Sequence, residues 1–301
     1  PINELLNFNN RLFFWQRDAF GVLSINDRSL ITDNNIGALT LGTGGVLTRF
    51  DYVTVTNGLA DNQNRAVNNS ESTIYWLDSL RREICAFNNS NNALSKLKSV
   101  QSYLNSDANL ILNDPITEYD KKYNEVLFTI KDKALVFNEQ LGVFTSFYNY
   151  RPDYYFHFSE NLYLFNSNNL FKYNEGDTRN LVKDTDKLSI IVFAVNKDYP
   201  QTKTFDNVEY AGDFTYGTNF DNLLFNTKRQ MCVLKSEGIH YREDTYKFAI
   251  PRNEIPFSEE NMSYKDRMKG KYLVCRYTYD CNNGNQFKVP YISTAYRHSL
   301  I

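Results

Sequence analysis

A short apolar segment with a polar break in its middle restricts the fold of this chain more than any other feature. Residues 160–176 read ENLYLFNSNNLFKYNEG. Leu162 and Leu164 fall on one face of an extended chain, and Tyr163 and Phe165 fall on the other, which predicts a strand covered on both sides. The pattern resumes after the Ser-Asn-Asn break, so the segment is predicted to form a β-hairpin.

The same hairpin pattern occurs twice earlier in the chain, at residues 126–138 (VLFTIKDKALVFN) and 74–88 (IYWLDSLRREICAFN). Each hairpin ends in an aromatic residue followed by asparagine. These aromatic residues, Phe87, Phe137 and Tyr173, are 50 and then 36 positions apart. Repeats of about 35 to 50 residues with four short strands each are typical of β-propeller blades. Chance pairing in an aromatic-rich antiparallel protein is the alternative.

The composition favours many short strands and excludes some classes of protein. Aromatic residues make up 15% of the 301 residues, with 22 Tyr and 22 Phe, and asparagine is abundant between the apolar runs. Asparagine tolerates positive φ and closes tight turns, so this composition suits hairpins. The net charge of −2 gives no basic footprint for nucleic acid, and no apolar run approaches the ~20 residues of a membrane span.

The pattern along the chain predicts two domains. Residues 1–183 are expected to form a propeller-like blade region, with about three blades in view and closure by residues outside this segment or by another part of the assembly. A polar, charged stretch follows, and residues 184–301 are expected to form a jelly-roll-like β-sandwich because the blade pattern stops. Leucines and a valine at helical spacing predict one short helix near 92–105, capped by Asn91 or Asn92. Because the chain begins with Pro1, we expect residue 1 to be an internal point of a longer polypeptide.

The carboxylates and histidines offer only weak candidates for catalysis. Glu118, Asp120 and Glu125 lie in TEYDKKYNE, and paired acids about 5 to 9 Å apart can hydrolyse glycosidic bonds. Two lysines lie between them, so we interpret the segment as a solvated loop. His157 is interpreted as a structural residue, and we expect neither it nor Glu118 to have a partner that could tune it for acid–base work. The sequence predicts no catalytic, cofactor or metal site.

The remaining reactive residues are also interpreted as structural. The other histidines, His240 and His298, lie far from one another and from any metal-ligand pattern. The four cysteines are too scattered for a disulfide scaffold and are expected to be buried free thiols. They are Cys85, Cys232, Cys275 and Cys281. The basic stretch at 264–277 could touch phosphate or an acidic partner, but it follows Glu259 and Glu260 and is interpreted as a solvated turn before a strand.

Residues 126–176 resemble the blade region of podovirus tail stabilisation proteins, in particular the large tail muzzle proteins of crAss-like bacteriophages. IYWLDSLRREICAFN with the following LSKLKSVQSYLN is similar to the preceding blade of those proteins. TKTFDNVEY, YKFAIPRNE, DRMKGKYL and ISTAYRHS resemble their C-terminal β-rich domain. The resemblance spans most of residues 70–301 and carries no catalytic motif. The family's proteins are much longer than this chain.

The resemblance implies a structural virion protein that is not an enzyme. Copies would form a ring around the DNA exit channel, six-fold if the resemblance holds, beside other tail and portal-proximal ring proteins. The protein would be assembled in the bacterial cytoplasm and would reside in the phage tail. The alternative is a carbohydrate-binding or glycoside-hydrolysing propeller of a tail or secreted protein, in which Trp15 and Trp76 would stack on sugars and two carboxylates would converge in a pocket.

The aromatic content also predicts a partner surface. Tyrosine and phenylalanine are enriched where one protein covers another. The strands KYLVCRYTYD and PYISTAYRHSLI alternate apolar and polar residues, as expected when one face lies on a core and the other meets a neighbour. We therefore expect inter-subunit contacts beyond ~1,000 Å² in the C-terminal domain. Charge reversal at Arg276 or Arg297 is expected to hinder assembly more than folding.

Overall fold

The chain divides into two compact units, Pro1–Asn174 and Glu175–Ile301. In this computed structural model, strands account for 57% of the chain and helices for 6%, so the prediction of a nearly all-β fold is confirmed. Within the ranges given next, residues 25–48 and 181–186 are described by their backbone alone. The residues that the structure describes are 1–25, 29–33, 37–41, 47–106, 114–175, 181–182, 185–186, 188–214, 219–255, 265–280 and 287–299.

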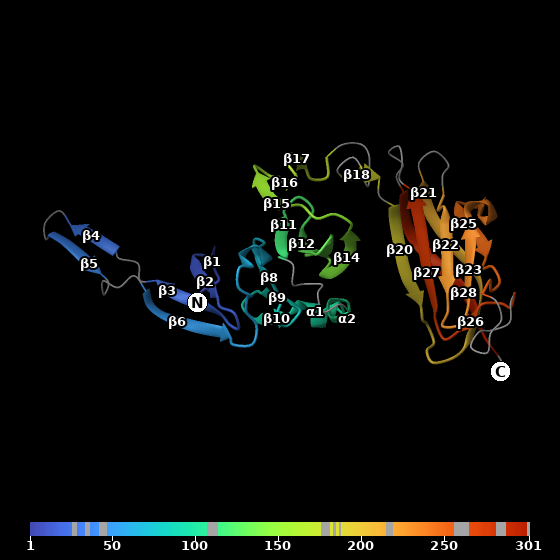
Figure 1. The fold of residues 1–301 in the computed structure, drawn as a ribbon, viewed down its shortest axis with the longest axis horizontal. Helices are drawn as coiled ribbons and strands as arrows, with labels where there is room; N and C mark the ends of the chain where they lie inside the picture. Colours follow the sequence, from blue (N-terminus) through green and yellow to red (C-terminus); the bar gives the residue numbers. More distant parts are fainter. Residues whose placement is uncertain are drawn as a thin grey trace. The chain divides into compact units, whose positions relative to one another are not determined.

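The first unit is a series of antiparallel sheets that follow one another along the chain (Figure 1). Three of them have four strands, and the fourth has three among the described residues. The first sheet is β1 (Glu4–Phe8), β2 (Arg11–Trp15), β3 (Phe20–Ile25) and β6 (Leu47–Thr54), and the second is β7 (Val67–Asn69), β8 (Ile74–Asp78), β9 (Glu83–Phe87) and β10 (Asn91–Ala93). The third is β11 (Ile116–Asp120), β12 (Glu125–Ile130), β13 (Lys133–Asn138) and β14 (Val143–Tyr148), and the fourth is β15 (Tyr154–Phe158), β16 (Asn161–Asn166) and β17 (Asn169–Lys172).

Three short elements connect or extend these sheets. The hairpin of β4 (Ser29–Asp33) and β5 (Gly37–Leu41) separates β3 from β6. A 3-10 turn, η1 (Asn64–Ala66), precedes β7. The helices α1 (Leu94–Leu97) and α2 (Gln101–Asn105) lie between the second and third sheets in sequence.

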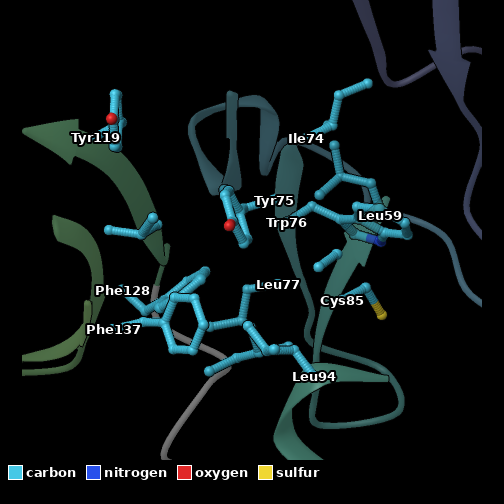
Figure 2. Packing of buried hydrophobic residues seen from close by; sticks show 14 of the residues in the cluster. Leu59, Ile74, Tyr75, Trp76, Leu77, Cys85, Leu94, Tyr119, Phe128 and Phe137 are labelled. Carbon is cyan, nitrogen blue, oxygen red and sulfur yellow. The ribbon is translucent and has the colours of Figure 1, made fainter. Parts of the chain in front are cut away.

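Aromatic side chains join the first three sheets into one core. The rings of Phe20 and Trp76 are 4.8 Å apart between the first and second sheets. On the other side of the second sheet, the ring of Tyr75 lies 6.0 Å from that of Phe137 on the third. Figure 2 shows Phe128 and Phe137 on the third sheet reaching toward the second. Because neighbouring residues of β8 point to opposite faces, this strand is buried along its whole length.

The three predicted hairpins are all present, with the short turns that their sequences indicated. Ser167 and Asn168 form the two-residue turn between β16 and β17, both with positive φ (47° and 74°). Such paired positive values match the right-handed twist of the flanking strands. Other asparagines occupy the same left-handed region, at Asn9, Asn10, Asn62, Asn89, Asn124 and Asn174. The predicted role of asparagine in turns is therefore confirmed.

The predicted helix near 92–105 is two short helices. Ser99 has a φ of +62°, which breaks the helical path between α1 and α2. The predicted cap at Asn91 or Asn92 is wrong, because both residues belong to β10 and pair with β9. The residue before α1 is Ala93, which makes no side-chain cap. The leucine spacing is borne out in part: Leu94 and Leu104 are buried in the core, whereas Leu97 is 65% exposed.

The second unit is built from two antiparallel sheets that share one core. The β20 sheet has the order β20 (Leu188–Val195), β27 (Leu273–Asp280), β22 (Asn222–Asn226) and β23 (Met231–Lys235). The β21 sheet contains β24 (His240–Arg242), β25 (Thr245–Ala249), β21 (Lys203–Phe214), β26 (Lys269–Gly270) and β28 (Phe287–His298). The short pair β18 (Leu181–Val182) and β19 (Thr185–Asp186) precedes them, and the 3-10 turn η3 (Ser236–Gly238) follows β23.

Tyrosines and phenylalanines fill the space between these two sheets. Tyr277 of the β20 sheet lies 6.3 Å from Tyr210 of the β21 sheet, and Phe225 lies 6.1 Å from Phe248, measured between ring centroids. Burial raises the pKa of the Cys275 thiol to about 12. Cys85, Cys232 and Cys275 are buried free thiols, as expected, and Cys281 lies outside the described residues.

The contact between the first two sheets predicts a large loss of stability when Phe20 is truncated. Phe20 is fully buried and its ring lies 4.8 Å from those of both Trp15 and Trp76. Phe20→Ala is expected to lower the free energy of unfolding of the first unit by about 3–5 kcal/mol. Urea unfolding followed by tryptophan fluorescence measures this, because both tryptophans of the chain lie in that unit.

Phe158→Ala is the matched control, since Phe158 is 70% exposed in the same unit. It is expected to change the free energy of unfolding by no more than about 0.5 kcal/mol. Equal effects of the two truncations would contradict the packing described here.

Candidate functional site

Three polar side chains meet where the second, third and fourth sheets come together. Oε1 of Glu118 on β11 lies 2.9 Å from Nε2 of His157 on β15, and it accepts a hydrogen bond of 3.0 Å from Nδ2 of Asn68 on β7. Each residue belongs to the first strand of its sheet. The expectation that neither His157 nor Glu118 has a partner is therefore wrong. They are 39 residues apart, so no local pattern shows the contact.

The segment around the candidate carboxylates is a hairpin, and the prediction of a solvated loop is wrong. β11 ends at Asp120, β12 begins at Glu125, and these two residues are directly opposite each other. Only the turn between them is solvated, and it contains both lysines. Because side chains alternate along a strand, Glu118, Asp120 and Glu125 lie on one face of the third sheet. This is the face that His157 meets.

Burial and hydrogen bonding raise the pKa values of three groups in this cluster. Asp120 is only 2% exposed, and burial raises its pKa although the backbone N–H of Lys122 donates to it. Burial also raises the pKa of Glu125, and the charge of Asp120 adds to this rise. The pKa of His157 is raised chiefly by its hydrogen bond to Glu118, against the effect of burial. The cluster therefore favours the protonated form of each of these three groups.

The geometry suits a structural contact better than a catalytic one. Oε1 of Glu118 is already engaged by Asn68, His157 and the backbone N–H of Tyr119, at 3.2 Å for the last. A general acid must come within hydrogen-bond reach of its substrate. Asp120 is too deeply buried for a sugar to approach it. The carboxylate of Glu118 thus links the first strands of the second, third and fourth sheets.

The other sequence candidates lie away from this cluster. His240 is exposed on β24, and Nε2 of His298 lies 3.8 Å from a carboxylate oxygen of Asp198. Trp15 and Trp76 are 0% exposed and cannot stack on sugars as the carbohydrate alternative requires. In the described ranges, no three or more histidine, cysteine or acidic side chains are placed to hold a metal ion. Nor does any helix within those ranges have the length and apolar character to cross a bilayer.

Part of the basic stretch at 264–277 is engaged in ion pairs. The guanidinium of Arg267 lies 2.6 Å from Asp206, and Arg297 of β28 lies 3.3 Å from the same carboxylate. Residues 269–270 and 273–280 belong to β26 and β27. Tyr264 and the acidic pair at 259–260 lie outside the described residues.

An acidic and aromatic hollow of about 650 Å³ opens on the second unit. It lies where β22 begins and β23 ends, beside β24 and β25. The carboxylates of Asp221 and Glu237 and the rings of Tyr241 and Tyr246 line it, together with Asn219, Ser236 and Ile239. The two rings are 4.9 Å apart. Carboxylates beside aromatic faces are the surroundings that a guanidinium group prefers.

The contact between His157 and Glu118 predicts a pH-dependent contribution to the stability of the first unit. Because the folded-state pKa of His157 is raised, this contribution is fully present below the ordinary histidine pKa of about 6.5. It is lost as the pH rises through the folded-state pKa. Urea unfolding at a series of pH values measures it, and Glu118→Gln is expected to flatten the profile above about pH 6.

Asp120 and Glu125 also have raised pKa values, but they titrate from a lower ordinary value near 4 and are unchanged in this variant. Their contribution cancels in the comparison with the wild-type chain. Glu160→Gln is the matched control, because Glu160 is exposed on the turn before β16. A Glu118→Gln profile that coincides with those of the wild type and the control would refute the prediction.

Comparison with known proteins places both units in one family. Residues 1–168 match the family described as Crassvirus muzzle protein, and residues 177–253 match the Crassvirus muzzle protein C-terminal domain. The muzzle protein of Bacteroides phage crAss001 is 28% identical over 233 residues. This alignment covers 75% of the chain but 16% of that relative's length. With more than half of its residues matched by the first family alone, the chain belongs to the Crassvirus muzzle protein family.

Proposed function

We propose that this chain is a structural part of a phage tail, in a muzzle or stabilisation ring around the DNA exit channel. Membership in the muzzle protein family is the observation that carries this proposal. Copies of the chain would form the ring, with the six-fold arrangement that the family resemblance implies. Portal-proximal and other tail ring proteins would be its neighbours. The protein would be assembled in the cytoplasm of the bacterial host and would reside in the virion.

The architecture suits a structural role in two ways. We propose that the sheets within residues 1–183 are blades of a partial propeller, since consecutive four-stranded sheets are joined through aromatic contacts. We propose a β-sandwich for residues 184–301, since the β20 and β21 sheets enclose one core. Further sheets would complete the propeller, because the outward residues of β15 are exposed, among them Tyr154 and Phe158. Stacked sheets of this kind make a stiff wall.

Labelling the intact particle tests the location. Antibodies against residues of the second unit, coupled to gold, are expected to mark the tail of purified virions in electron micrographs. Antibodies against a capsid protein of the same phage are the control for accessibility and should mark the head. A chain that is absent from purified particles, but abundant in the infected-cell lysate, would overturn the proposal.

The same proposal predicts that the chain does not turn over glycans. The purified chain is expected to release no product from capsule or cell-wall polysaccharides, because Asp120 is buried and Glu118 is engaged by three donors. Glu118→Gln is expected to be incorporated into particles at the wild-type level. Hydrolysis that Glu118→Ala abolishes while the fold stays intact would favour the glycosidase alternative instead.

A further inference from the structure

The outward face of the β20 sheet is mainly apolar and is not covered in the described structure. Leu188, Ile190 and Val192 of the edge strand β20 point away from the core and are 52%, 40% and 61% exposed. The strand registers place further apolar residues beside them on the same face. These are Ala194, Val274, Leu224, Val233 and Met231. An apolar sheet face of this kind marks a contact with another protein.

Arg276 lies in the middle of this face, and the registers place polar residues toward its ends, namely Thr278, Asp280, Asn222, Asn226 and Lys235. Arg276 stands between Val192 on β20 and Leu224 on β22, in register with both. It is exposed and makes no ion pair or hydrogen bond with its side chain among the described residues. The two arginines at Asp206, by contrast, are paired within the unit. An unpaired guanidinium within an apolar contact surface needs a carboxylate from the partner.

The second unit itself carries a surface with the matching chemistry. The acidic and aromatic hollow lies where β22 begins and β23 ends, beside β24 and β25. Glu237 is exposed there and makes no ion pair among the described residues, and Asp221 accepts only the backbone N–H of Asp280 through Oδ2. The rings of Tyr241 and Tyr246 offer faces on which a guanidinium can stack.

We propose that Arg276 of one copy of this chain enters the hollow of the next copy, with the apolar face of the β20 sheet packed around it. This rests on the proposed ring function and names the surfaces that would form it. The two surfaces are different: one is the outward face of the β20 sheet, and the other lies at the ends of β22 and β23 beside β24 and β25. Such a contact is heterologous, and it generates a closed ring when the rotation between copies closes. Charge complementarity between Arg276 and the acidic hollow fixes which surfaces meet.

Charge reversal and charge exchange test the contact. Sedimentation of the full chain over a range of concentrations measures self-association. Arg276→Glu and Glu237→Arg are each expected to weaken it about tenfold or more, because each places like charges together. The double variant with both substitutions restores the attraction and is expected to recover most of the lost affinity. Asp221→Asn, which keeps its acceptor for the backbone N–H, should weaken association less than Glu237→Arg.

Arg11→Glu is the matched control, because Arg11 is exposed on β2 of the first unit and belongs to neither surface. It is expected to associate like the wild type, and thermal unfolding verifies that each variant is folded. A wild-type chain that stays monomeric at its highest soluble concentration overturns the proposal, as does normal association of Arg276→Glu. If gold labelling still finds the chain in the tail, only the proposed surfaces are rejected and the structural function stands.

Discussion

Aromatic contact between successive sheets is the interaction on which the first unit depends. A sheet of four short strands cannot bury both of its faces alone, and an isolated two-stranded hairpin is only marginally stable in water. In the second sheet, the two faces of strand β8 are covered by the first and third sheets. Trp76 of β8 faces Trp15 and Phe20, while its neighbour Tyr75 faces Phe137 of the third sheet. Each sheet therefore completes the core of the sheets beside it.

The polar contact near Glu118 follows the same repeat. Asn68, Glu118 and His157 each lie on the first strand of their sheet, so stacking the sheets brings them together. Asn68 and Glu118 are 50 residues apart, the same spacing as between Phe87 and Phe137. From the second sheet to the third, the aromatic hairpin ends and these polar positions therefore repeat at the same spacing. Since an acid buried without a charged partner is costly, the raised pKa of Asp120 is a consequence of this stacking.

The sequence predicted local features such as hairpins and turns. It did not predict contacts between residues of different sheets. Period-two patterns and asparagine turns were sufficient for the hairpins because strand and turn preferences act within a few residues. The helix was divided because the backbone at Ser99 reverses, and the leucine spacing does not record that. The contact between His157 and Glu118 joins distant strands, although aligning the repeats by strand would have placed both at the start of a sheet. The two lysines of TEYDKKYNE suggested a solvated loop. They lie in a solvated turn of only four residues, and the acids on either side of it belong to strands.

The outward faces of the two sheets of the second unit differ in composition. This difference indicates which face is suited to a partner. On the β21 sheet the outward charges are paired, with Nζ of Lys247 3.9 Å from Glu209 and the hydroxyl of Tyr291 donating to Glu209 at 3.0 Å. On the β20 sheet the outward residues of strand β20 are aliphatic, and the side chain of Arg276 makes no ion pair or hydrogen bond among the described residues. Solvation stabilises the first arrangement, whereas burial against another surface would stabilise the second. A chain with aromatic cores on the inside of both units has no need of an aliphatic outer face for folding, so this face is best explained by assembly.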